Sequence, residues 1–258
     1  MALARTLEQA AAFVDRVGIA LVFGKADVVL PSLWDEVCGP GADWAVRDER
    51  GKAVAFTPEF DRLWHWKDDL PDRRLACAGR HLARDAAALI SRRLVPAVYA
   101  LTGRPATPEG FRELELAPLE HEVAEAVLAE GPLSAPELRR LLATDDKKGV
   151  DKAVKLLQRE LVLTNAGVTQ QEAGWPAVRQ DVFARRWRAR LKRLPPEDEA
   201  RRTLARTVLA AAGEVSDVDL AAALGWPKRL AATTLQDLGN RRLATAVQEE
   251  GFRVWSPR

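Results

Sequence analysis

The chain has 258 residues, 47% hydrophobic and 29% charged, as expected of a folded protein with room for two or three small domains. Its formal net charge of +2 gives no overall attraction to nucleic acid, so any such binding must come from local clusters of charge. Two distant cysteines and three scattered histidines match no zinc-site spacing, and no apolar run approaches the roughly 20 residues of a membrane-spanning helix. We therefore expect a cytoplasmic protein that has no metal site and does not enter a membrane.

Residues 1–115 form the first predicted domain, which is mainly helical. The pattern predicts a helix that runs into an apolar segment over residues 5–23 and a short helix over residues 30–39. It also predicts a long helix over residues 83–101 that is interrupted at Pro96.

One motif of this first domain combines aromatic rings with carboxylates. The stretch "LWHWKDDLP" places Trp64, His65 and Trp66 directly before Asp68 and Asp69. Rings beside a carboxylate can hold an extruded base and the water that attacks it. In the alternative interpretation the tryptophans are core residues and the aspartates cap the end of a helix.

Residues 116–178 contain a pattern that the chain uses twice. A helix that ends at Gly131 is followed by Ser134 and, three residues later, Glu137, the spacing of a capping box. A polar turn leads to a third helix, and "LVLTNAGVTQ" predicts two short strands around an Asn165-Ala-Gly turn.

Residues 198–258 repeat this order. A helix stops at Gly213, Ser216 and Asp219 form a second capping box, and "KRLAATTLQDLGN" is the third helix. Two strands, over 242–248 and 252–256, are joined across residues 249–251.

Helix, capped helix, turn, helix and β-hairpin is the order of a winged helix-turn-helix domain. We expect a mainly α fold of the α+β class with tandem winged helices, because two copies with the same cap chemistry are harder to attribute to chance than one. The alternative is a pair of generic α+β units that pack against a protein partner.

Residues 179–197 are predicted to be a basic connector helix between the two repeats. Phe183, Trp187, Leu191 and Leu194 are spaced as one apolar stripe of a helix that ends before Pro195-Pro196. Seven of residues 179–193 are basic and one is acidic, so the outer faces are expected to contact phosphates.

The third helix of each repeat is expected to supply the remaining DNA contacts. In a helix-turn-helix this helix enters the major groove, and lysines without Asn or Gln at its start favour backbone contact over base readout. The predicted DNA-binding residues are Lys147, Lys148, Lys152, Lys155 and Arg159 in the first of these helices, Arg185, Arg186, Arg188, Arg190, Lys192 and Arg193 in the connector, and Lys228, Arg229, Arg241 and Arg242 in or after the second.

The combination of "AFVDRVGIALVFGKADVVLPSLWDEV", "LWHWKDDLP" and "GWPAVRQDVFARRW" with a further winged helix resembles the winged-helix DNA glycosylases, which excise alkylated purines and unhook interstrand crosslinks. The resemblance implies three winged-helix units that form a concave DNA-binding surface, a role in repair, and no metal or organic cofactor. The family carries a catalytic Gln followed two positions later by Gln or Asp. The corresponding segment here, "VGIALVFGKAD", has no Gln, and its only carboxylate is Asp27.

The family enzymes also carry a β-rich domain after the winged helices, and this sequence stops at Arg258 without one. Both departures count against glycosylase activity and leave binding of double-stranded DNA as the expected function. Three alternatives stay open: an active glycosylase that uses Asp27, Asp68 or Asp69, a transcriptional regulator, and a protein-interaction scaffold.

Overall fold

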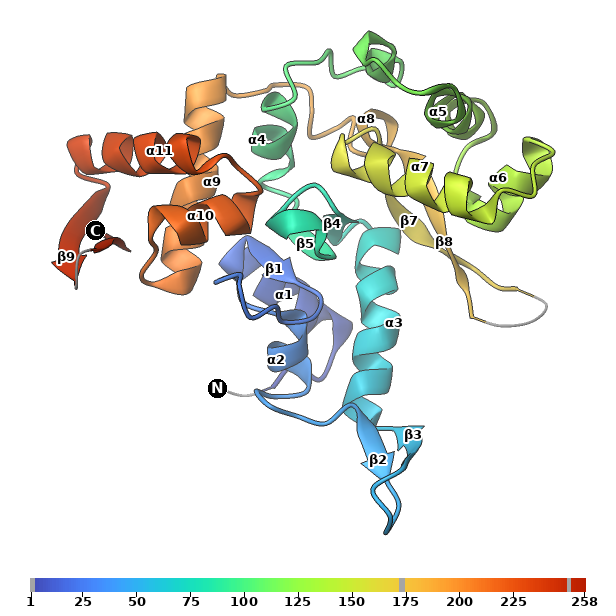
Figure 1. Ribbon diagram of the computed structural model, residues 1–258, viewed down its shortest axis with the longest axis horizontal. Helices are drawn as coiled ribbons and strands as arrows, with labels where there is room; N and C mark the ends of the chain where they lie inside the picture. The colour runs from blue at the N-terminus through green and yellow to red at the C-terminus, as the bar shows by residue number, and fades with distance from the viewer. Residues whose placement is uncertain (1–2, 172–174, 250–251) are drawn as a thin grey trace.

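The computed structural model describes residues 3–171, 175–249 and 252–258. The N-terminal part of the chain, which we call the first repeat because it follows the same plan as the two repeats predicted after it, contains α1 (Leu7–Val17), β1 (Ile19–Leu21), α2 (Leu33–Val37), β2 (Ala45–Arg47), β3 (Ala53–Phe56), α3 (Pro58–Asp72), β4 (Ala76–Gly79) and β5 (Ala88–Ser91). Strands β1, β5 and β4 form an antiparallel sheet in that order. The hairpin of β2 and β3 is inserted between α2 and α3 and projects away from the rest of the molecule (Figure 1).

Side-chain caps fix where the helices of this repeat begin. The Thr6 hydroxyl accepts a hydrogen bond from the Gln9 backbone N–H at the start of α1, and Thr57 caps α3 in the same way ahead of Pro58. Ser32 caps α2, so this helix begins at Leu33, inside the range predicted for it.

The long helix predicted over residues 83–101 is wrong. This segment forms a short 3-10 turn (Ala83–Asp85), then β5, then α4 (Val95–Ala100), and Pro96 lies in the first turn of α4. Every residue of β5 is buried, because β5 is the middle strand of its sheet. A short continuous apolar run of this kind fits a buried strand as well as a buried helix.

The second repeat contains α5 (Pro118–Glu130), β6 (Leu133–Ser134), α6 (Ala135–Leu141), α7 (Lys147–Arg159), β7 (Leu163–Thr169) and β8 (Ala177–Val182). The predicted capping box is present, since the Ser134 backbone N–H and hydroxyl both donate to Glu137 Oε2, at 2.7 and 2.6 Å. The sheet order is β6, β8, β7.

The turn predicted at Asn165-Ala-Gly is wrong, because this tripeptide lies inside β7. The register against β8 shifts between Asn165 and Val168, and the Gly167 N–H donates to Asn165 Oδ1 at 2.8 Å. Gly167 has a φ of +97°, so the sequence that reads as a hairpin turn makes a bulge in a continuous strand.

The third repeat contains α9 (Glu197–Ala212), α10 (Asp217–Leu224), α11 (Lys228–Asn240), β9 (Ala244–Glu249) and β10 (Phe252–Pro257). The Ser216–Asp219 capping box is confirmed. The two predicted strands pair with each other, while positions 250 and 251 of the predicted connection lie outside the described residues. Val215 forms a bridge with Trp255 of β10, in place of a first strand.

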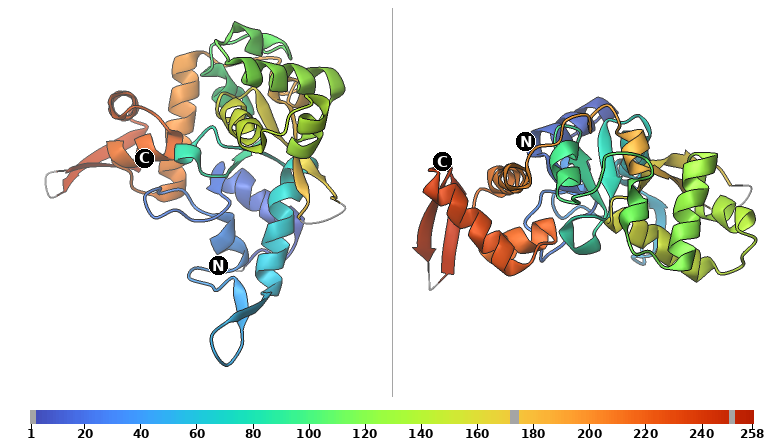
Figure 2. Two further views of the ribbon diagram at one scale, coloured as in Figure 1. Left: turned by 45° about the vertical axis from the view of Figure 1, so that its right-hand side comes forward. Right: turned by 90° about the horizontal axis from the view of Figure 1, so that it is seen from above.

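All three repeats follow one plan. Each has a helix, a short strand or bridge, two further helices and two final strands, and the first strand or bridge pairs with the last strand. The first repeat lies between the other two (Figures 1 and 2). The hairpin of β2 and β3 is an addition to this plan.

The connector is not the helix that was predicted over residues 179–197. Its first residues belong to β8, and α8 (Phe183–Arg186) is a single turn. The chain continues in turns in which Trp187 N–H donates to Phe183 O and Leu191 N–H to Trp187 O. This spacing of four keeps the expected side chains on the buried side, although the helix itself is short.

The buried connector residues join the first and third repeats. Phe183, Trp187 and Leu191 belong to one apolar cluster with Leu94 of the first repeat and Leu204 of the third. The remainder of the first repeat and the second repeat each have a core of their own. Over the described part of the chain, no helix has the length and apolar character needed to cross a membrane.

Candidate DNA interface and adjoining cleft

A cleft of about 490 Å³ lies where the first and second repeats meet. Its walls come from α3, the ends of β1 and β4, α7, and both strands of the hairpin β7–β8. The charged side chains that line it are Lys67, Asp68, Arg80, Asp151 and Lys155. Polar contacts between the two repeats hold this junction together: Thr164 Oγ1 donates to Ala78 O at 2.9 Å, and Arg159 pairs with Asp85.

Asp68 is the carboxylate that α3 turns into the cleft. Lys67 Nζ donates to Asp68 Oδ2 at 2.5 Å, and Asn165 Nδ2 of β7 donates to Oδ1 at 3.3 Å. The Asp68 side chain is only 15% exposed. Each carboxylate oxygen has a second lone pair, so Asp68 can still accept a hydrogen bond from a water molecule or a ligand.

Aromatic and amide groups surround this carboxylate. Lys67 Nζ lies 4.3 Å from the centre of the Trp64 ring, a cation–π contact that holds the ammonium group beside Asp68. Deeper in the wall, Gln158 Nε2 donates to Gln180 Oε1 at 2.7 Å, and both amides are buried. The cleft therefore offers an acceptor, a cation and a ring face in one place.

The other carboxylates predicted as candidates do not line this cleft. Asp27 is exposed and lies 3.7 Å from Lys25 Nζ. Asp69 follows Asp68 on α3, and its backbone carbonyl accepts the N–H of Arg73 at the end of that helix. Trp66 is buried in the core, as the alternative interpretation has it, whereas Trp64 lines the cleft.

Helix α7 presents the predicted lysines to solvent. Val150, Ala153 and Leu157 face the core, and Lys148, Lys152 and Lys155 follow one another at spacings of four and three on an exposed face. Among the described residues, none of these three lysines forms an ion pair. Lys147 is exposed as well, while the Arg159 guanidinium pairs with Asp85 at 2.5 Å. Lys155 also lines the cleft, so the basic face and the cleft adjoin.

The connector arginines divide into two groups. Arg185 donates to the carbonyls of Val127 and Leu128, both at 2.8 Å, and pairs with Asp181. Arg186 is buried, and its guanidinium donates to the carbonyls of Pro71 and Asp72 at the end of α3. Both guanidinium groups join structural elements, and Arg186 does not face solvent as expected, whereas Arg185 is 32% exposed. The exposed part of the predicted basic face consists of Arg188, Arg190, Lys192 and Arg193.

The four cations of the third repeat that were predicted to bind DNA are all exposed, but two of them are paired. Lys228 Nζ lies 3.7 Å from Asp217, and Arg241 pairs with Asp237 at 2.9 Å. The other two of these four, Arg229 and Arg242, form no ion pair among the described residues.

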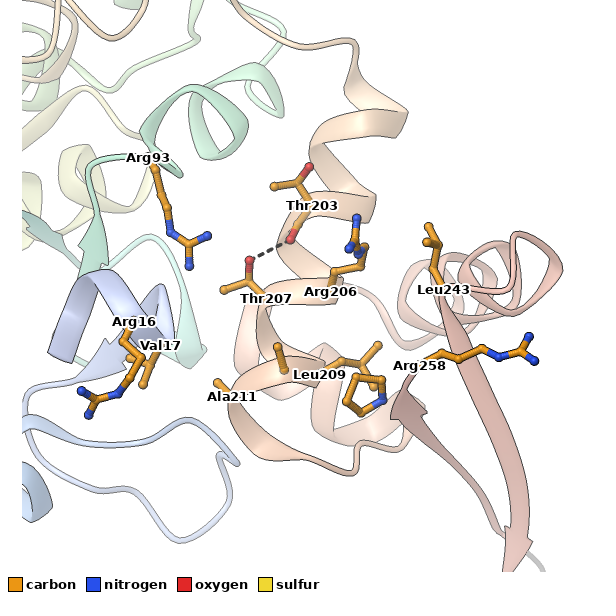
Figure 3. A pocket seen from close by; sticks show the side chains of 12 residues that line it. Arg16, Val17, Arg93, Thr203, Arg206, Thr207, Leu209, Ala211, Leu243 and Arg258 are labelled. Carbon is orange, nitrogen blue, oxygen red and sulfur yellow. Dashed lines mark hydrogen bonds between the residues drawn. The ribbon is translucent and has the colours of Figure 1, made fainter. Parts of the chain in front are cut away.

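A larger cavity, about 630 Å³, lies between the end of α1, the turn before α4 and one side of α9. Arg93 extends from that turn towards Thr207 of α9, whereas Arg16 and Arg258 point away from it (Figure 3). No acidic side chain is among the described residues that line it. The cavity therefore lacks a side chain that could activate water, which the smaller cleft has.

Two features of the site were missed at the level of sequence. Asn165 donates a hydrogen bond to Asp68, which lies 97 positions earlier in the sequence, and no local spacing could indicate this contact. Trp175, placed just before β8, packs its ring 5.5 Å from that of Trp64. The described residues include no group of three or more His, Cys, Asp or Glu side chains that could hold a metal ion.

Comparison with known proteins assigns the family. Residues 4–225 match the protein family described as AlkZ related. The chain belongs to this family. Members of the AlkZ-related family take their name from a DNA glycosylase, and a solved structure of that enzyme, Streptomyces sahachiroi DNA glycosylase AlkZ, is similar to this chain with a TM-score of 0.55 at 17% sequence identity. At that identity the match shows a common fold.

The match covers 96% of this chain and 64% of the AlkZ structure, so the chain spans less than two thirds of the length of AlkZ. No curated protein matches the sequence.

Proposed function

We propose that the three repeats are winged-helix units, over residues 1–115, 116–178 and 198–258, and that the protein binds double-stranded DNA in a repair context. Membership of the AlkZ-related family and the shared plan of the three repeats support this proposal. In each repeat the third helix and the final hairpin stand where a winged helix has its recognition helix and wing.

The observation that carries the proposal is the lysine face of α7 beside a cleft that contains a carboxylate. Lys148, Lys152 and Lys155 carry their charges without ion-pair partners among the described residues, so these charges are available to neutralise phosphates. Arg188, Arg190, Lys192 and Arg193 are exposed and extend the set, and Arg229 and Arg242 supply weaker contacts.

The third helix of the first repeat has a different role. Between Pro58 and Asp72 it carries five carboxylates and two cations, so it does not suit a phosphate backbone. It also packs against β7, as the contact of Asn165 with Asp68 shows. We assign α3 to the wall of the cleft and α7 to the DNA groove.

A second candidate function, DNA glycosylase activity, is favoured by the position of Asp68. A carboxylate beside an extruded nucleoside can activate water and stabilise the positive charge that develops on the sugar. The segment that corresponds by resemblance to the family's Gln motif contributes Val22 and Phe23 to the same cleft. These two side chains have no polar atoms, and the only acidic group of that segment, Asp27, does not line the cleft.

The first experiment is fluorescence anisotropy of a labelled, undamaged duplex titrated with protein at 50 and 200 mM salt. The proposal predicts tight binding at low salt that falls steeply at the higher concentration. Absence of binding at low salt would remove this function and leave a protein-interaction scaffold. One duplex sequence bound far more tightly than random DNA would indicate a transcriptional regulator.

Excision of a base is tested separately, with duplexes that contain alkylated purines. Release of the base by the wild type that is lost in Asp68→Asn and kept in Asp27→Asn would assign the reaction to the cleft. Binding of DNA without release of any base would support a non-catalytic relative of the glycosylases.

A further inference from the structure

Seven aromatic rings form a continuous cluster on one side of the cleft. They come from five parts of the chain and include rings from both the first and the second repeat. The cluster consists of Phe23 after β1, Trp34 of α2, Trp44 and Phe56 of the hairpin β2–β3, Phe60 and Trp64 of α3, and Trp175 before β8. We call this cluster the aromatic surface.

Packing within the core explains only part of the aromatic surface. Phe60 is buried at its centre, with ring centroids of five neighbours within 6.4 Å. The outer rings are open to solvent: Trp175 is 63% exposed, Trp44 43% and Phe23 39%. A contiguous set of exposed large rings is unusual on a soluble protein and indicates a surface that binds something.

The position of the aromatic surface beside α7 favours nucleic acid. Lys67 lies over Trp64 at 4.3 Å and Arg47 over Trp44 at 5.9 Å. Each of these two cations pairs with a carboxylate, Asp68 and Asp43 respectively, so the charge available to phosphates is that of the α7 lysines. Trp64 and Phe23 also line the cleft, which continues to Lys155 on α7. A strand whose phosphates follow the lysines of α7 would therefore bring its bases to the rings.

The geometry of stacking determines which structural form of DNA such rings can bind. In an intact duplex the base faces are covered by their neighbours, so a protein ring can stack only on a base that has left the helix or was never paired. Stacking on an aromatic side chain accepts every base, because each base has a π face.

We propose that the aromatic surface stacks unpaired bases, so that the protein binds duplex DNA interrupted by an unpaired stretch in preference to intact duplex. This inference rests on the DNA binding proposed above and adds the structural form of the DNA that is recognised. Trp175 has the central role, because it is the most exposed ring and joins the second repeat to Phe56 and Trp64 of the first, at 6.1 and 5.5 Å.

The test compares two DNAs of equal length and charge: an intact duplex, and the same duplex with a central bulge of three unpaired bases in which one is 2-aminopurine. We expect the wild type to bind the bulged DNA at least fivefold more tightly, the lower end of what one stacked base contributes. The 2-aminopurine fluorescence should fall on binding, because stacking quenches it.

Two variants test the contribution of the Trp175 ring to this preference. Trp175→Ala should bring the affinity for bulged DNA down to that for intact duplex and abolish the quenching, while its affinity for intact duplex stays unchanged. Trp175→Phe keeps a ring and should keep most of the preference. Because Trp175 is exposed, both variants should keep the fold, and thermal melting checks this.

Equal affinity of the wild type for both DNAs would overturn this inference and leave the proposed duplex binding intact. A preference that survives in Trp175→Ala, with quenching unchanged, would also overturn it. No binding to either DNA would overturn both proposals, and the aromatic surface would then be assigned to a protein partner.

Discussion

Removing the lysine face of α7 gives a quantitative test of the DNA interface. The triple variant Lys148→Gln, Lys152→Gln, Lys155→Gln removes three exposed charges and no buried contact. Each neutralised phosphate contributes about 0.9 to the slope of log K against log salt concentration, so the slope should become shallower by about 2.7. Between 50 and 200 mM salt, wild-type affinity should then fall about 40-fold more than that of the variant. Anisotropy titrations at four salt concentrations measure both slopes.

A matched control separates local contact from total charge. The triple variant Arg16→Gln, Arg112→Gln, Arg201→Gln also lowers the net charge by three, but each of these arginines is paired with a glutamate and none belongs to α7. Its salt slope should match that of the wild type. An equal decrease in the two triple variants would refute the assignment of the phosphate contacts to α7.

Three further predictions concern the framework of the site. In urea unfolding, Arg186→Ala should lower the free energy of unfolding by about 2–4 kcal/mol, because the buried hydrogen bonds of Arg186 to the α3 carbonyls are lost. The control Arg188→Ala, at an exposed position, should stay within about 0.5 kcal/mol of wild type. Equal values for the two variants would contradict the structural role of Arg186. Gly167→Ala should lower the free energy of unfolding more than Gly51→Ala does. Both glycines have a positive φ, but of the two only Gly167 has a neighbour that a Cβ would meet, the Asp72 side chain of α3 at 2.4 Å. The reverse order of the urea midpoints would count against the packing of β7 on α3. Burial lowers the pKa of His81 from 6.5 to about 4, so the unfolded state takes up this proton first as the pH falls. Between pH 7.5 and 5.0 the free energy of unfolding of the wild type should therefore fall by about 2 kcal/mol because of His81, and this part of the decrease should be absent in His81→Phe. Equal pH dependence of the two proteins would exclude this contribution of His81.

The local parts of the fold could be predicted because their signals lie within a few residues. Ser134 with Glu137 and Ser216 with Asp219 mark two helix starts, and both capping boxes are present. The order of elements in the second and third repeats followed from these caps and from helical periodicity. The same plan in the first repeat was not visible, because the β2–β3 hairpin interrupts it and its strands are as short as three residues.

The errors share one physical cause, which is that tertiary contacts decide between local alternatives. Ala88–Ser91 is a strand because it lies between β1 and β4, although its apolar run fits a helix equally well. Asn165-Ala-Gly becomes a bulge because β8 pairs on both sides of it. The connector turns after Arg186 because its aromatic residues enter a core shared by two repeats.

The prediction that Arg185 and Arg186 of the connector contact phosphates was based on their charge alone, and the structure gives them another role. A guanidinium group has five N–H donors, so an arginine near the end of a helix can donate to several carbonyls of its last turn. Arg185 donates to Val127 and Leu128 at the end of α5, and Arg186 to Pro71 and Asp72 at the end of α3. These bonds tie the second repeat to α3, the helix that carries Asp68 and Trp64. The two arginines that were expected to bind phosphate therefore join structural elements, and we expect their substitution to alter DNA binding through loss of folding.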